Sequence, residues 1–252
     1  APVIGTPNFI GVYVLDEPHT AEQLEIARLT FLSLAQDGTL GLPTTTFTSH
    51  ITSEAVASIQ PPATIIFDYP FRTGESPDSS SAIIKVVKRI NERVHFLEAM
   101  DRDLWHMPQA FNDRIEGTAY PVQPSMHSAQ LGGALLAGAR GIIPFTYNTA
   151  GTLQGLRRSD LSASPALDVY RRYNELLKRL GPTLLQMSAP ALDDRAPHPF
   201  VVSTAISEAG ETYMFALNAD DATTRTLLVD LMFDQPTGLF DLVSEKPITM
   251  GA

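Results

Sequence analysis

The chain has 252 residues, 44% of them hydrophobic and 18% charged, enough to bury one large core or a core with a smaller domain beside it. Its formal net charge of −10 argues against nucleic acid or an anionic membrane as a partner, because both need a basic surface. The absence of cysteine excludes disulfides, thiolate nucleophiles and cysteine zinc sites. No apolar run reaches the roughly 20 residues of a membrane span, and no segment reads as a signal peptide. The compartment stays open, with a secreted or periplasmic location slightly favoured.

Apolar, β-branched runs alternate with helical patterns through the first 190 residues. The runs predict strands over residues 9–15, 42–47, 63–71, 104–111 and 141–147. The helical patterns cover residues 20–38, 53–59, 80–100, 125–140 and 164–181. This alternation predicts parallel strands joined by helical crossovers, in either a (β/α) barrel or a doubly wound sheet.

The first helix has a clear start, because Thr20 as N-cap and Gln23 three residues later form a capping-box pattern. No glycine-rich phosphate loop separates this helix from the strand before it, which disfavours a dinucleotide-binding fold. The glycines of residues 132–141 lie mostly inside a predicted helix and indicate close helix packing.

The pattern changes near residue 190. From Phe200 onward, short alternating runs are separated by turn signals, which predicts a small antiparallel β-domain. We therefore expect a (β/α) barrel, or part of one, over residues 1–190 and a β-sandwich over residues 191–252. The second domain is small and is expected to pack on the first.

Polar and aromatic residues follow most of the predicted strands, where (β/α) barrels carry their chemistry. A sugar needs such groups, because its ring stacks on apolar faces and its hydroxyls need hydrogen-bonding partners. The candidate catalytic residues are Asp16 and Glu17. The candidate substrate-binding residues are Asp68, Tyr69, Trp105, His106, Gln109, Phe111, Asn112, Asp113, Tyr147 and Asn148. Trp105 fits either a stacking platform or a core position.

Pro18 ends the first strand directly after the two acids. Adjacent strand residues point to opposite faces, so Asp16 and Glu17 share a site only if the strand twists or bulges at its end. Otherwise, one acid faces the cleft and the other forms a salt bridge. The histidines show no paired spacing for metal binding, and no Gly-x-Ser-x-Gly elbow occurs. We expect neither a metal nor a cofactor.

The segment GVYVLDEPHT, residues 11–20, resembles the fourth-strand acid motif of (β/α)8-barrel glycoside hydrolases. Residues 124–148 are similar to their last helix–strand step, and the C-terminal region resembles the small β-sandwich that often follows such barrels. This resemblance implies a hydrolase acting on a poly- or oligosaccharide. The Asp16–Glu17 pair is reminiscent of substrate-assisted hexosaminidases. In such enzymes Glu17 would protonate the leaving oxygen and Asp16 would orient the acetamido group, with two close carboxylates pushing their pKa values apart.

Two departures from that pattern keep alternatives open. Five strand–helix units stand where a full barrel has eight, so a second chain or an N-terminal fragment would have to complete it. Gln109 stands where a nucleophilic Glu would be expected. Double displacement with Glu17 as acid/base would need Asp68 or Asp113 as nucleophile, with carboxyl groups about 5 to 5.5 Å apart. A non-catalytic half-barrel that binds carbohydrate or a partner, and a lyase or isomerase, are the other possibilities.

Overall fold

The structure is a computed structural model. It describes residues 20–37, 44–48, 56–57, 59, 61–71, 79–115, 118–119, 123–149, 153–220, 227, 240–241 and 246–247. The predicted strand over residues 9–15 and the acids Asp16 and Glu17 lie outside these ranges, so their placement stays a prediction.

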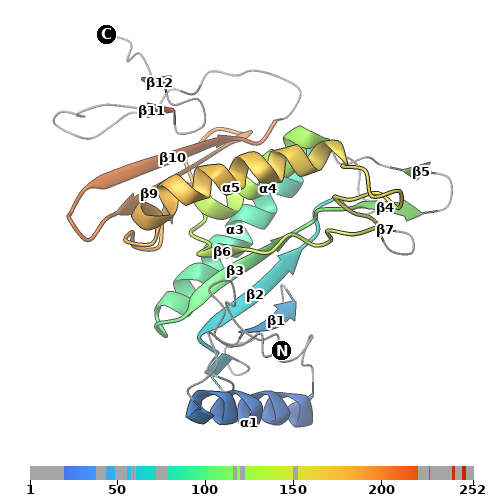
Figure 1. Ribbon diagram of the computed structural model, residues 1–252. Helices are drawn as coiled ribbons and strands as arrows, with labels where there is room; N and C mark the ends of the chain where they lie inside the picture. The colour runs from blue at the N-terminus through green and yellow to red at the C-terminus, as the bar shows by residue number, and fades with distance from the viewer. Residues whose placement is uncertain are drawn as a thin grey trace.

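A parallel sheet forms the centre of the molecule (Figure 1). Its strands follow the order β1-β2-β3-β6, and each neighbouring pair is parallel. Their bounds are β1, Thr44–Thr48; β2, Ala63–Asp68; β3, Asp103–Pro108; and β6, Gly141–Ile142. A parallel bridge between Gln109 and Phe145 continues the β3–β6 pairing beyond the strands. The predicted parallel arrangement is therefore confirmed for these strands.

Long helices precede, connect and follow the described strands: α1, Ala21–Asp37; α3, Ser79–Glu98; α4, Pro124–Leu136; and α5, Pro165–Leu184. The capping box before α1 is present, since the Gln23 N–H donates to Thr20 Oγ1 at 3.1 Å and the Thr20 N–H donates to Gln23 Oε1 at 3.0 Å. These reciprocal bonds satisfy two donors that a helix start otherwise leaves without partners.

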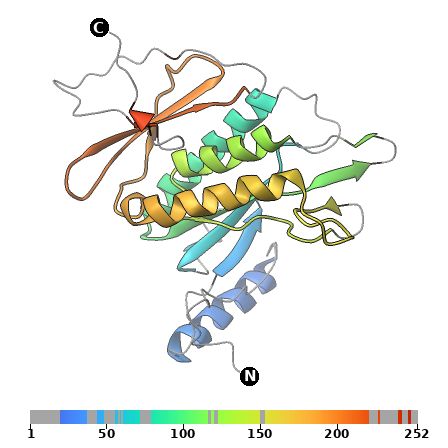
Figure 2. The same cartoon turned by 45° about the horizontal axis from the view of Figure 1, so that its top comes forward.

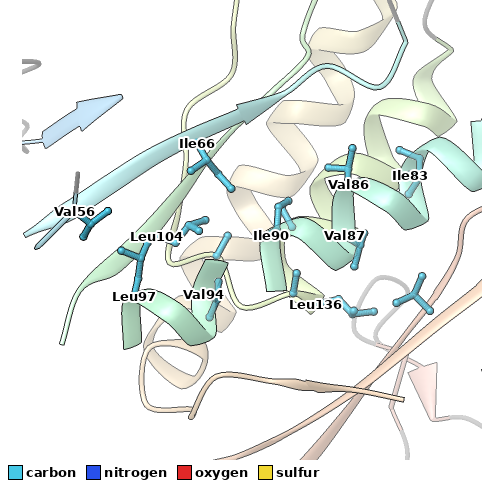
Figure 3. Close-up of a cluster of buried hydrophobic side chains, with 14 of the residues drawn as sticks. Val56, Ile66, Ile83, Val86, Val87, Ile90, Val94, Leu97, Leu104 and Leu136 are labelled. Atoms are coloured by element: carbon cyan, nitrogen blue, oxygen red, sulfur yellow. The ribbon is translucent and has the colours of Figure 1, made fainter. Parts of the chain in front are cut away.

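The main core lies between the parallel sheet and α3 (Figure 3). Helix α3 presents Ile83, Val87, Ile90, Val94 and Leu97 at spacings of three and four residues, which places them on one helix face. They pack with side chains from the facing side of the sheet, namely Ile66 and Leu104, and with α4 through Ala134 and Leu136.

The strand order and the helix positions are those of parallel strands joined by helical crossovers. Each crossover moves the chain to the next strand in the same direction, and α3 and α4 share one core on one side of the sheet. A doubly wound sheet instead reverses direction and places helices on both faces. The described strands thus favour the first of the two predicted arrangements. Closure of a barrel stays a prediction.

A second, antiparallel sheet packs on the other side of the helices (Figure 2). Its strands are β8, Ala191–Leu192; β9, Phe200–Ile206; and β10, Thr212–Asn218, in the order β10-β9-β8. Val201 and Ala219 belong to the main core, and Ser203 Oγ donates to the Leu136 carbonyl at 2.8 Å. The antiparallel sheet therefore shares its core with the helices.

Five further short strands complete the described elements. They are β4, Asn112–Ile115; β5, Thr118–Ala119; β7, Leu153–Gln154; β11, Phe240–Asp241; together with β12, Lys246–Pro247, which pairs antiparallel with β11. The sheet β5-β4-β7 extends from the carboxyl end of the parallel sheet. The predicted β-sandwich stays a prediction. In the part of the chain that the structure describes, no helix combines the length and apolarity of a membrane span.

Candidate functional site at the carboxyl ends of the parallel strands

Aromatic rings from three neighbouring parallel strands meet at the carboxyl end of the sheet. Phe67 and Tyr69 stack with ring centroids 5.1 Å apart, and Tyr69 also stacks on Phe145 at 6.1 Å. Phe111 meets Tyr69 edge-on at 5.1 Å and Phe145 at 5.9 Å. We call Phe67, Tyr69, Phe111 and Phe145 the aromatic cluster.

The strand geometry explains why the aromatic cluster forms. Phe67 and Tyr69 are two residues apart in and after β2, so they lie on the same face of the sheet, opposite Ile66. Gln109 and Phe145 are bridge partners, so the chain after β3 and the chain after β6 run side by side there. Phe111 is buried, whereas 39% of Phe145 is exposed. The aromatic cluster thus has a buried side and a side open to solvent.

Asp68 lies between Phe67 and Tyr69 in sequence and points the other way. Its carboxylate pairs with the guanidinium of Arg89 on α3, on the helix-covered side of the sheet. This placement follows from strand alternation, because residues 67 and 69 share the opposite face. Asp68 is therefore a link between β2 and α3, and its observed position does not support a nucleophilic role or contact with a ligand on the aromatic cluster.

Gln109 is fully buried, and its side-chain amide forms hydrogen bonds with the surrounding backbone. Its Oε1 accepts the Phe71 N–H at 3.0 Å, and its Nε2 donates to the Phe111 carbonyl at 3.3 Å and the Phe71 carbonyl at 3.4 Å. These bonds tie the segment after β2 to the segment after β3. Gln109 thus positions the two segments that carry Tyr69 and Phe111, and does not itself present a group to a ligand.

Trp105 and His106 lie within β3, on opposite faces. The Trp105 ring packs against Gly141, where an added Cβ would lie 2.7 Å from the ring. His106 is fully buried on the helix-covered face, and burial lowers the pKa of its imidazole to about 4 against a weaker opposing effect of the Ile66 backbone. His106 is therefore neutral at pH 7. Its burial does not support contact with a ligand, and we leave it out of the proposed site.

The remaining predicted site residues lie in the segments that extend past the strands. Tyr147 is 50% exposed, and its hydroxyl accepts a hydrogen bond from Arg157 Nε at 3.1 Å. Asn148 is also exposed and bridges to Arg157 through its backbone. Asn112 and Asp113 begin β4 and pair with β7, and the structure does not describe their side chains. Tyr147 therefore lies where it can contact a ligand.

The sequence reasoning missed Phe67 and Phe145. The signal for Phe67 was its spacing of two residues from Tyr69, which predicts a shared face in a strand. Phe145 lies two residues before Tyr147. Its neighbours in space follow only from the pairing of β3 with β6, so the sequence alone did not indicate that it joins the aromatic cluster. Among the described residues, no three His, Asp or Glu side chains gather as a metal site would require.

No protein-family model and no curated protein matches the sequence. The fold is similar to that of a beta-glucuronidase from Faecalibacterium prausnitzii, with a TM-score of 0.51 and 12% identity over 67% of this chain and 32% of that one. A beta-galactosidase from the psychrophilic Marinomonas ef1 matches with a TM-score of 0.48 and 13% identity over 67% of this chain and 29% of that one. The matched region therefore spans about a third of the length of each enzyme.

Proposed function

We propose that this chain is part of a glycoside hydrolase that binds a poly- or oligosaccharide at the carboxyl ends of its parallel strands. The observation that carries the proposal is the aromatic cluster, which spans three adjacent strand ends and exposes Phe145 beside the exposed Tyr147. Flat aromatic faces with nearby polar groups suit sugar rings. The likeness to a glycosidase fold, with helices on one side of the sheet, supports the same class.

In this proposal Glu17 is the general acid/base and Asp16 is its partner. Both follow the predicted strand over residues 9–15, which would run beside β1 and deliver them to the same end of the sheet. The pairing of Asp68 with Arg89 disfavours double displacement through Asp68. That leaves the substrate-assisted route, with Asp16 orienting a 2-acetamido group, or a nucleophilic Asp113.

A non-catalytic role in carbohydrate binding is the second candidate. It is favoured by Gln109, which stands where a nucleophilic carboxylate would be expected and is committed to the backbone of Phe71 and Phe111. In that case the aromatic cluster would bind saccharide without turnover.

We further propose that another polypeptide segment completes the barrel. The matched region covers only about a third of the length of each of these two enzymes. On the side of the sheet away from α3, Phe67, Trp105 and Met107 are only partly buried by the described residues. A strand-bearing second chain or an N-terminal fragment would cover such a face, as the remaining strands do in a closed barrel.

The test is hydrolysis of aryl glycosides, with and without a 2-acetamido group, by the wild-type chain and its Glu17→Gln variant. Removing a general acid typically costs 10²- to 10⁴-fold in rate, so we expect a loss of at least about 100-fold with little change in Tm. Glu22→Gln is the matched control, because Glu22 is an exposed acid in the first turn of α1. Full activity of Glu17→Gln would refute the assignment. Saturable glycan binding without turnover in the wild type would favour the second candidate.

A further inference from the structure

A pocket of about 210 Å³ opens beside the aromatic cluster. It lies between the segment after β3 and the first turns of α4 and α5, and its walls include Phe111, His127, Arg158 and Ser164. Phe111 also packs edge-on against Tyr69 and Phe145, so the pocket adjoins the aromatic cluster directly. Its volume is several times the roughly 30 Å³ that one water molecule occupies in the liquid.

Two helices begin at this pocket. Helix α4 starts at Pro124 after Gln123, and α5 starts at Pro165 after Ser164; all four residues line the pocket. Neither helix start has a hydrogen bond from its N-cap side chain. Both helices begin with proline, which has no N–H, and the Leu167 N–H donates to the Ser164 carbonyl at 3.0 Å. The helix dipole still places a partial positive charge at each start, so a negatively charged oxygen of a ligand is stabilised there.

Polar atoms without partners provide an independent sign of a ligand. His127 is only 2% exposed, and its imidazole is hydrogen-bonded to the Gln109 backbone. Its Nδ1 atom and Ser164 Oγ have no hydrogen-bond partner among the described residues. Burial lowers the pKa of His127 to about 4, so at pH 7 the ring is neutral and its second nitrogen accepts a hydrogen bond. The pocket wall therefore needs a donor such as a hydroxyl, as well as an anion.

The charge balance of the pocket suits a single negative charge. Two helix N-termini contribute roughly +0.5 each, and the exposed guanidinium of Arg158 adds one full charge. The negative charge of Asp160 offsets part of this positive charge, because its carboxylate interacts electrostatically with Arg158. The carboxylate also accepts hydrogen bonds from Ser162. About one net positive charge remains.

We propose that this pocket is a subsite for an acidic sugar, whose carboxylate binds at the starts of α4 and α5 beside Arg158 and whose hydroxyl donates to His127 Nδ1. The inference rests on the proposed function, because it assumes a saccharide on the adjoining aromatic cluster. It adds the substrate class: a saccharide that contains a uronic acid unit.

Calorimetric titration of the full chain with glucuronate, glucuronamide, glucose and acetate tests this subsite. The amide keeps the shape of glucuronate and removes its charge, so we expect glucuronate to bind at least about tenfold more tightly, the size of one charge-assisted hydrogen bond. Arg158→Ala should remove most of that difference, and Ser164→Ala should reduce it severalfold. Arg171→Ala is the control, because Arg171 is an exposed arginine on α5 that pairs with Asp168 and does not line the pocket.

The possible results separate this inference from the proposed function. If the three sugars bind equally, the acidic subsite is refuted and the carbohydrate function stands. If acetate binds as tightly as glucuronate, the pocket takes simple anions and the sugar assignment is refuted. If glucuronate binding is unchanged in both Arg158→Ala and Ser164→Ala, the pocket is the wrong location. Absence of binding by every sugar, together with no binding of oligosaccharides, would refute the proposed function itself.

Discussion

The helix-covered side of the parallel sheet and the carboxyl ends of its strands differ in how completely their side chains are buried. On the helix-covered side, Ile66 and Leu104 are buried against α3, and Asn91 of α3 donates to the carbonyls of Ala137 and Pro190. At the carboxyl end, Phe145 and Tyr147 remain exposed, and Ser164 Oγ and His127 Nδ1 lack described partners. Packing closes the first region, although Thr64 Oγ1 and both ring nitrogens of His106 also lack described partners there. The second region differs in the aromatic side chains that it leaves exposed, as expected of a surface that binds a ligand.

The two buried histidines, one in each region, give the largest expected effect on stability. Burial lowers the pKa of both His106 and His127 to about 4, below the value near 6.5 of the unfolded chain. Their contribution to stability is therefore complete above pH 6.5 and is lost as the pH falls toward 4, by up to about 3 kcal/mol for each ring at 1.36 kcal/mol per pKa unit. Urea unfolding across this range measures the loss.

Single variants assign that pH dependence to the two regions. His106→Asn and His127→Asn should each remove part of the slope between pH 6.5 and 4. In NMR spectra, glucuronate should shift the His127 ring signals and leave those of His106 unchanged. Ring signals that titrate near pH 6.5 would contradict the buried, neutral state of either histidine.

Two helical glycines test how tightly the helix-covered region is packed. At Gly133 of α4, an added Cβ would lie 2.5 Å from Cγ2 of Val87 on α3, whereas at Gly181 of α5 nothing lies within 4 Å. Gly133→Ala should destabilise the protein by about 1–3 kcal/mol through overpacking. Gly181→Ala should stabilise it by up to about 1 kcal/mol, the ordinary helix preference of alanine. Equal effects of the two changes on the free energy of unfolding would mean that α3 and α4 are not in close contact.

Phe145 tests the open region, where binding should change more than stability. Phe145→Ala removes a stacking face of the aromatic cluster and should weaken oligosaccharide binding by about tenfold, typical of one aromatic contact. Leu161→Ala, at an exposed apolar position outside the aromatic cluster, is the control. A loss of stability as large as that of Gly133→Ala, with unchanged affinity, would place Phe145 in the core instead.

Asp68 gives the smallest expected effect. It lies at a strand end but pairs with the half-exposed Arg89 on the helix-covered side. Because solvent screens such pairs, Asp68→Asn should cost no more than about 1 kcal/mol in unfolding free energy and leave saccharide affinity unchanged. A large loss of glycan binding would return Asp68 to the site. An unchanged affinity would separate strand-end residues that face the ligand from those that face the helices.

Features encoded over short stretches could be predicted from the sequence. The capping box of Thr20 and Gln23, the helical spacing of α3, and the alternation of strands and helices all lie within a few turns of chain. Local propensity and periodicity specify such elements, so the described helices and the parallel order of β1, β2, β3 and β6 were predicted correctly. The bounds were less accurate for β6, predicted over residues 141–147 and observed as Gly141–Ile142.

The tertiary structure alone decided which residues meet. Asp68 and Tyr69 are neighbours in sequence, yet one pairs with α3 and the other stacks on Phe145, 76 positions away. Gln109 was a candidate ligand-binding residue because of its polar amide, but in the structure that amide hydrogen-bonds to the backbone of Phe71 and Phe111. Strand alternation determines which face of the sheet a side chain occupies, and the register between strands determines its neighbours. Neither the face nor the neighbours can be read from the residue at that position alone. Composition and periodicity therefore determined the kinds of elements and their order, while packing between distant segments determined the aromatic cluster and the pocket beside it.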